Sequence, residues 1–112
     1  MSAVLHQLMA VLEERKTNPP PNSYTARLYQ GGVSKIGRKI EEESREVIEA
    51  ASEPGEQGRR HLIYESSDLM YHLLVMLAFN GIKLDEVEAE IARRFGQSGL
   101  DEKAARTALA AK

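Results

Sequence analysis

Two pairs of acidic residues repeat at a spacing of three, about one helical turn. Glu43 and Glu46 lie in the stretch "EEESREVIEA", and Glu65 and Asp68 lie in "YESSDLMYHLLVML". Residues three apart share one face of a helix, and carboxylates so spaced on facing helices build metal sites in helical bundles. Oxygen ligands favour hard cations such as Mg²⁺ or Mn²⁺. The pattern therefore indicates a divalent-metal site.

The first pair lies at the edge of an apolar helix face. The helix expected over residues 34–51 buries four residues: Ile36, Ile40, Val47 and Ala51. Glu43 falls ~60° from the centre of that face, because successive side chains turn by ~100°. Glu46 continues the same edge. Three other glutamates are expected to face water: Glu41, Glu42 and Glu49.

The second pair interrupts a more apolar helix, expected over residues 60–80. Its apolar centre is assigned to Leu62, Leu69, Leu73 and Met76. Glu65 falls ~40° from Leu69, His72 ~60° and Asp68 ~100°, all on one side. A carboxylate within an apolar arc needs a compensating cation, because burying an unpaired charge costs several kcal/mol or more. We therefore expect the two acidic edges to face each other and share cations.

Two lysines continue the edge that carries the first pair. Lys35 and Lys39 would bind an anion, and a phosphate bridging Mg²⁺ and lysine would satisfy both groups. The competing interpretations stay open from the residues alone. Acidic pairs are common on solvated helices, Lys39 could simply pair with Glu43 for ~0.3–0.5 kcal/mol, and His72 could be a satisfied core histidine.

The positioning elements are all helical, since no window alternates as a strand does. Beyond the two helices above, the sequence predicts a helix over 3–16, broken by "TNPPPN". Ser23 caps a short helix that Gly31 and Gly32 end. "SEPGEQG" separates the two acidic helices. Asp85 and Glu88 are expected to form a capping box for a helix that ends at about Phe95. "GQSG" then precedes a terminal helix over 100–111. We predict an all-α bundle of four to five helices.

Composition limits the class of protein. The 112 residues suit one domain, 1–112, and the net charge of −2 gives no reason to expect nucleic acid as a partner. The absence of cysteine excludes disulfides and thiolate chemistry and suits a reducing cytoplasm. No secretory leader is evident, and the charge-free run 69–82 is shorter than the ~20 residues that span a bilayer. We expect a soluble, cytoplasmic protein without a membrane partner.

Longer segments resemble a known family. "SYTARL", "GVSKIGRKIEEE", "DLMYHLLVML" and "RRFGQSGLDEKAAR" are similar to phosphoribosyl-ATP pyrophosphohydrolases, members of the MazG-like all-α pyrophosphohydrolases. The superfamily pattern E-x-x-E followed by E-x-x-D matches Glu43/Glu46 and Glu65/Asp68, and it specifies chemistry rather than substrate. Gly37 departs from the bulkier residue that the family often carries there.

The resemblance implies cleavage of phosphoribosyl-ATP to phosphoribosyl-AMP and pyrophosphate, the second step of histidine biosynthesis. The four matched carboxylates would hold Mg²⁺, or alternatively Mn²⁺, and Lys35 and Lys39 would offset phosphate charge. Glu46 or Glu43 would act as the base, with Glu46 preferred, and His72 would orient a ligand. The resemblance also implies a homodimer or higher homo-oligomer.

Two other functions stay open at this point. A general pyrophosphohydrolase of simple nucleoside triphosphates such as dUTP or dCTP would carry the same acidic residues. A non-enzymatic helical interaction module would have solvated or paired acids, no hydrolysis and no stabilisation by divalent metal.

Overall fold

The computed structural model describes residues 3–95, which form four helices and no strand. These residues fall into two compact units that divide between Ile82 and Lys83. The first contains α1 (Ala3–Glu14), α2 (Tyr24–Ala51) and α3 (Gly55–Phe79), and the second contains α4 (Leu84–Phe95). The all-α prediction is therefore confirmed. The predicted "GQSG" break and the helix over 100–111 lie outside the described residues.

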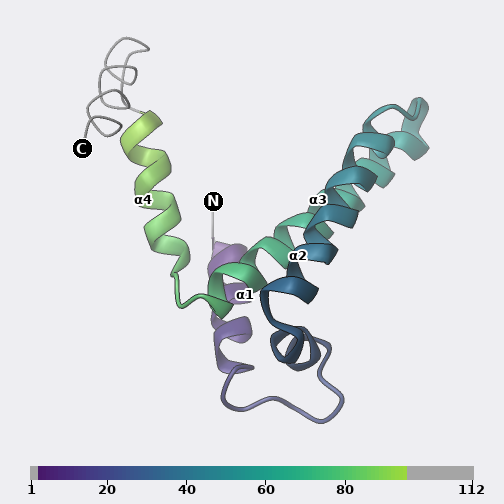
Figure 1. Cartoon of the computed structure of the whole chain (residues 1–112). Coiled ribbons are helices and arrows are strands. Elements are labelled where there is room, and N and C mark those ends of the chain that lie inside the picture. Colours follow the sequence, from purple (N-terminus) through teal and green to yellow (C-terminus); the bar gives the residue numbers. More distant parts are fainter. Residues whose placement is uncertain (1–2, 96–112) are drawn as a thin grey trace. The chain divides into compact units, whose positions relative to one another are not determined.

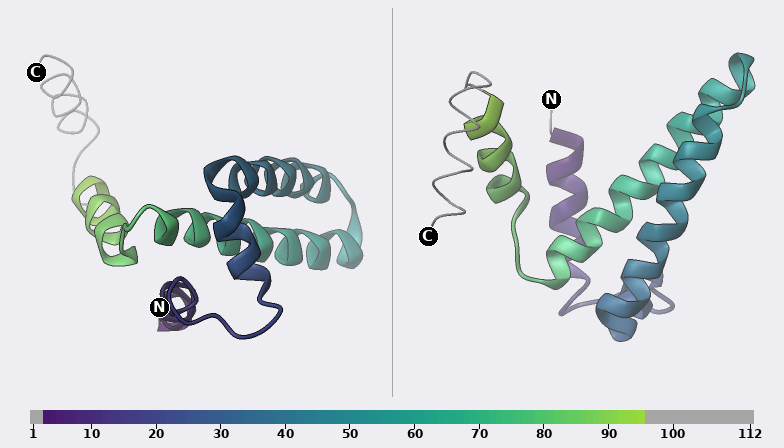
Figure 2. Two further views of the ribbon diagram at one scale, coloured as in Figure 1. Left: turned by 60° about the horizontal axis from the view of Figure 1, so that its bottom comes forward. Right: turned by 45° about the horizontal axis from the view of Figure 1, so that its top comes forward.

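The first unit is built around a pair of helices. α2 and α3 run side by side as a hairpin joined by a short turn, and α1 packs against α3 (Figures 1 and 2). Two hydroxyl contacts tie the start of α2 to α3. The Tyr24 hydroxyl lies 2.8 Å from His72 Nε2, and Thr25 Oγ1 lies 2.6 Å from the Tyr71 hydroxyl. The largest fully buried side chains of the described residues are Leu12, Leu28, Ile36 and Val75.

α2 consists of two helical segments that meet at a kink. Ser23 caps the first, as predicted, because its Oγ accepts a hydrogen bond from the Ala26 N–H at 3.1 Å. Gly32 interrupts the helix with φ 67° and ψ −161°, a conformation that residues with a Cβ rarely adopt. The kink lets the first segment pack near the end of α3, where Tyr29 stacks on Phe79.

α3 begins at Gly55, five residues before the predicted start at residue 60. The prediction was wrong because the glycines of "SEPGEQG" suggested a loop. Gly58 instead allows a close approach of backbone: a Cβ there would meet the Glu53 carbonyl oxygen at 2.2 Å. The turn into α3 therefore folds back tightly onto its first helical turn.

The buried faces differ in part from those predicted. On α2, Ile36 is buried as expected, but Ala50 is buried where Ala51 was predicted. On α3, Leu73 is 48% exposed, although it was assigned to the apolar centre. The buried side chains of α3 are instead Glu65, His72, Leu74, Val75 and Ala78. A helix that is apolar on most of its circumference does not reveal by its pattern which side faces the core.

α4 begins with a different cap from the one predicted. Glu86 Oε2 accepts a hydrogen bond from the Lys83 N–H at 2.9 Å, so Glu86 takes the place that Glu88 was expected to fill. Near the other end of α4, Glu90 contacts Arg93 at 2.7 Å and Arg94 at 2.8 Å. These hydrogen bonds lower the pKa of Glu90 to about 2.

α3 is also the one described helix long and apolar enough to cross a membrane, by length and composition only. A core helix of a soluble protein passes the same test. The buried side of α3 carries Glu65 and His72, and such polar groups are costly in hydrocarbon. We therefore interpret α3 as the core helix of the hairpin.

We predict that Gly58→Ala destabilises the protein. The added Cβ would meet the Glu53 carbonyl oxygen at 2.2 Å, and overpacking with a backbone shift typically costs ~1–3 kcal/mol. Urea unfolding followed by circular dichroism measures the change. Gly37→Ala is the matched control, since its Cβ would meet only Met76 Cε at 4.0 Å. This variant should be more stable than wild type by ~0.5–1 kcal/mol, because alanine favours the helix more than glycine does. A Gly58→Ala protein as stable as wild type would contradict this account of the turn.

Candidate metal centre

Three of the four predicted metal ligands converge between α2 and α3. Glu43 and Glu46 extend from α2 and Glu65 from α3, and one carboxylate oxygen of each lies within 4.8 Å of the other two. Glu43 and Glu65 are each only 6% exposed, and Glu46 is half-buried. Asp68, the fourth predicted ligand, is half-buried and does not belong to this group.

Glu65 has a buried oxygen without a hydrogen-bond partner. Its Oε1 is the one such side-chain atom among the residues that the structure describes. Buried polar atoms nearly always have a partner, and an unpaired buried carboxylate is costly. An oxygen of this kind beside two further carboxylates fits a hard divalent cation, which takes carboxylate ligands.

The nearby acidic groups change the pKa of Glu46. Its pKa is raised, chiefly by the neighbouring Glu65 carboxyl and also by desolvation. A bound cation would offset this negative charge and favour the ionised form of Glu46.

His61 contacts the cluster from the outside. Its Nε2 lies 3.0 Å from Glu65 Oε2, and its Nδ1 lies 3.0 Å from both carboxylate oxygens of Glu53. Each ring nitrogen faces only acceptors, so both contacts are hydrogen bonds when the ring carries both protons. The pKa of His61 is accordingly raised, chiefly by the hydrogen bond to Glu53 and also by that to Glu65. His61 was not among the residues predicted from the sequence, although it lies four residues before Glu65 within the expected helix.

His72 lies on the opposite side, between the cluster and Tyr24. It is buried, and its Nδ1 lies 2.9 Å from the Asp68 carbonyl oxygen. A carbonyl only accepts, so Nδ1 donates this bond, and Nε2 accepts from the Tyr24 hydroxyl at 2.8 Å. The same Nδ1 is 3.6 Å from Glu43 Oε1. The residue therefore lies beside a candidate ligand with both ring nitrogens engaged.

Tyr24 is a second neighbour that the sequence analysis did not select. Its ring stacks on Tyr71 with centroids 6.3 Å apart, and its side chain is partly exposed. The pKa of its hydroxyl is raised, first by burial and also by the negative charges of Glu43 and Asp68, while Lys39 lowers it. The proton consequently stays on the hydroxyl, which suits its role as donor to His72.

The two predicted phosphate-binding lysines differ in their contacts. Lys39 Nζ lies 3.3 Å from Glu42 Oε1, so the alternative pairing with Glu43 was wrong. This hydrogen bond raises the pKa of Lys39, and the ammonium stays charged. Lys35 is half-buried and forms no ion pair with any residue among 3–95. Glu41, Glu42 and Glu49 are exposed, as predicted.

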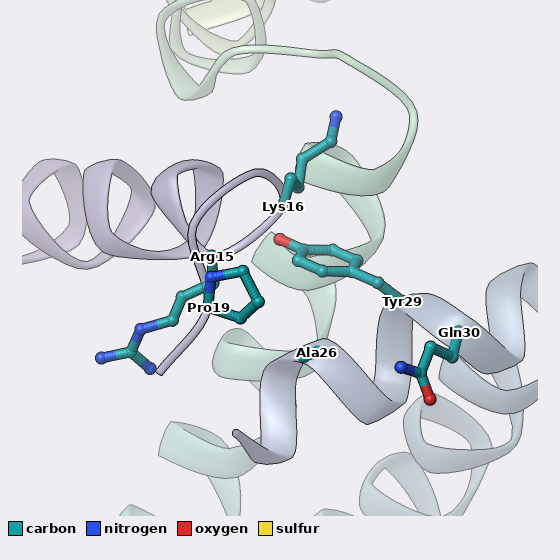
Figure 3. A pocket seen from close by; sticks show the side chains of 6 residues that line it. All are labelled: Arg15, Lys16, Pro19, Ala26, Tyr29 and Gln30. Carbon is teal, nitrogen blue, oxygen red and sulfur yellow. The ribbon is translucent and has the colours of Figure 1, made fainter. Parts of the chain in front are cut away.

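A separate hollow lies between the proline-rich loop and the first segment of α2 (Figure 3). It has a volume of about 250 Å³ and is lined by Arg15, Lys16, Pro19, Ala26, Tyr29 and Gln30. Two bonds fix its walls: the Tyr29 hydroxyl donates to the Leu12 carbonyl at 2.7 Å, and Lys16 Nζ donates to the Ala78 carbonyl at 2.7 Å. None of the predicted site residues lines it.

The fold and the cluster together define an all-α protein with a carboxylate site suited to a divalent cation. A family model described as phosphoribosyl-ATP pyrophosphohydrolase matches residues 5–95. The chain therefore belongs to the phosphoribosyl-ATP pyrophosphohydrolase family.

Individual relatives agree with this assignment. A protein of Rhodopirellula baltica named phosphoribosyl-ATP pyrophosphatase is 57% identical over 93% of this chain and 87% of its own length. Proteins with the same name from Methylococcus capsulatus and Rhodobacter capsulatus are 48% and 47% identical. Their alignments cover 92% and 91% of this chain and 95% and 96% of the respective relatives.

We predict that divalent metal raises the melting temperature of the wild-type protein but not that of Glu65→Gln. A ligand present at 100 times its Kd stabilises the folded state by ~2.7 kcal/mol. Glutamine keeps the shape of Glu65 but removes its charge, so the metal-free variant should melt at or above the wild-type temperature. Differential scanning calorimetry with Mg²⁺, Mn²⁺ or chelator makes the comparison.

Glu49→Gln is the control, since Glu49 is an exposed glutamate of the same α2 helix. It should respond to metal as the wild type does. If metal raised the melting temperature of Glu65→Gln as much as that of the wild type, Glu65 would not be a metal ligand.

Proposed function

We propose that this protein hydrolyses phosphoribosyl-ATP to phosphoribosyl-AMP and pyrophosphate, the second step of histidine biosynthesis. Family membership and the names of the relatives support the reaction. The observation that carries the proposal is the meeting of Glu43, Glu46 and Glu65 around the buried, unpartnered Oε1 of Glu65. Such a site suits a reaction in which a triphosphate must be neutralised.

The proposed ligands of Mg²⁺ are Glu43, Glu46, Glu65 and Asp68, with Mn²⁺ as the alternative ion. The first three are supported by their convergence. Asp68 is proposed because it follows Glu65 by about one turn of α3 and is half-buried. Bound metal would supply charge neutralisation of the phosphates and a polarised water.

The chain's own residues would then divide the remaining work. Glu46 is the preferred base, because it is more exposed than Glu43 and the neighbouring Glu65 carboxyl raises its pKa. Glu43 is the alternative base. His72 is proposed to orient Glu43 by packing beside its carboxylate, since Nδ1 of the ring lies 3.6 Å from Oε1 while its proton is donated to the Asp68 carbonyl.

Lys35 and Lys39 are proposed to bind the phosphates. Both extend from the same α2 segment as Glu43, and neither ammonium is needed to neutralise a buried acid among the described residues. Positive charge close to the leaving pyrophosphate stabilises the charge that develops on it. The exposed Glu42 partner of Lys39 is readily replaced by a phosphate, since surface ion pairs contribute little.

A homodimer or higher homo-oligomer in the cytoplasm is proposed as the working form, without nucleic acid or membrane partners. Large apolar side chains are exposed on the hairpin helices: Val33, Ile48, Ile63, Met70 and Leu73. Exposed large apolar side chains favour association with another protein surface. A second copy would cover them in a symmetric assembly.

Pyrophosphate release from phosphoribosyl-ATP, with Mg²⁺ and with chelator, tests the reaction. We expect Mg²⁺-dependent release from this substrate, and none from dUTP, dCTP or ATP under the same conditions. Release from the simple triphosphates alone would support a general nucleotide pyrophosphohydrolase. No release from any of them by folded protein would support the interaction module.

Substitution of the proposed ligands tests the site. Glu43→Gln and Asp68→Asn should each lower kcat by ~100-fold or more, because each removes a charged ligand at similar volume. Glu49→Gln should keep wild-type turnover, since that side chain is exposed on α2. Wild-type turnover and Mg²⁺ dependence in Asp68→Asn would show that Asp68 is not a metal ligand. The same result in Glu43→Gln would refute the cluster as the active site.

A further inference from the structure

A row of three side chains leads from the turn before α3 into the acidic cluster. Glu53 contacts Nδ1 of His61 through both of its oxygens at 3.0 Å, and Nε2 of the same ring lies 3.0 Å from Glu65 Oε2. Glu53 and His61 are partly exposed, whereas Glu65 is buried. The row therefore runs from solvent to a candidate metal ligand.

We propose that His61 is a positioning residue for the metal site, which orients the Glu65 carboxylate and is itself held by Glu53. The inference rests on the proposed function, because Glu65 is taken as a metal ligand. The hydrogen bond from Nε2 occupies Oε2, so Oε1 is left for the cation. Oε1 of Glu65 is the buried atom without a hydrogen-bond partner among the described residues.

The geometry of the helix explains why one histidine can do this. His61 and Glu65 are four residues apart on α3, so their side chains lie over one another on the same face. A glutamate side chain rotates about several bonds, and fixing it in one rotamer reduces the entropy lost when a metal binds. Groups that hydrogen-bond to metal ligands in this way tune both affinity and geometry.

The conformation of the turn before α3 places Glu53 beside His61. The buried Gly58 lets the Glu53 backbone approach so closely that a Cβ on Gly58 would meet the Glu53 carbonyl oxygen at 2.2 Å. Gly55 enters the helix with φ 74°, a conformation suited to glycine. Two glycines in four residues thus permit a turn in which Glu53 reaches His61 from outside the helix.

Three substitutions at His61 separate the two halves of the row. His61→Gln places an amide N–H near the position of Nε2 and keeps the bond to Glu65. His61→Asn places one near Nδ1 and keeps only the contact with Glu53. His61→Leu removes both contacts. Binding of Mn²⁺ alone is measured by electron paramagnetic resonance, and thermal melting without metal shows that each variant is folded.

We expect about a tenfold higher Kd for Mn²⁺ in His61→Leu and His61→Asn, and a Kd within about threefold of wild type in His61→Gln. A merely structural role would not distinguish the glutamine from the asparagine variant. Arg60→Gln is the matched control, because Arg60 is the exposed neighbour of His61 and, among residues 3–95, its ion pair is with the exposed Glu56 at 3.7 Å. It should bind Mn²⁺ as wild type does.

The outcomes separate this inference from the function on which it rests. Wild-type affinity in folded His61→Leu, or equal affinities in the glutamine and asparagine variants, would overturn the role of His61 and leave the metal site standing. Absence of Mn²⁺ binding in the wild type itself would overturn the metal site and the inference together.

Discussion

The main constraint on the hairpin is that it buries groups of like charge between α2 and α3. Glu43 and Glu65 face each other from two helices at a place where an ordinary core would carry aliphatic side chains. Buried carboxylates repel one another and lose their hydration, so the helix pair holds them at a cost in stability. Such an arrangement makes sense physically when a cation completes it, because the cation removes both penalties at once.

Hydrogen bonds on both sides hold the cluster in place. On one side His72 connects the backbone of α3 to Tyr24 at the start of α2, next to Glu43. On the other side His61 connects Glu65 to the turn between the helices. The acidic residues are therefore fixed from the kinked end of α2 and from the tip of the hairpin. Rigid helices between these two ends give the site its precision.

Helical spacing predicted which glutamates of α2 lie in the acidic cluster better than it predicted the packing. The rule that residues three apart share a face placed Glu43 with Glu46 and singled them out from the exposed Glu42 and Glu49, and the structure agrees. The same arithmetic misassigned Leu73, because most of the circumference of α3 is apolar. Polar residues within an apolar helix were the better guide to its buried side, since a buried polar residue needs a specific reason to be there.

Contacts that depend on a turn were beyond the reach of the sequence. The interaction of Glu53 with His61 requires α3 to begin at Gly55, and the glycines around it suggested a loop. A glycine permits a loop, a left-handed turn or a close approach of backbone equally well, and only the neighbouring chain decides which is used. Here the neighbour is Glu53, whose backbone fills the space that a side chain at Gly58 would need. The acidic cluster and the spacing of His61 to Glu65 could be read from residue types on helices, whereas the contact of His61 with Glu53 depends on a turn that the residue types do not specify.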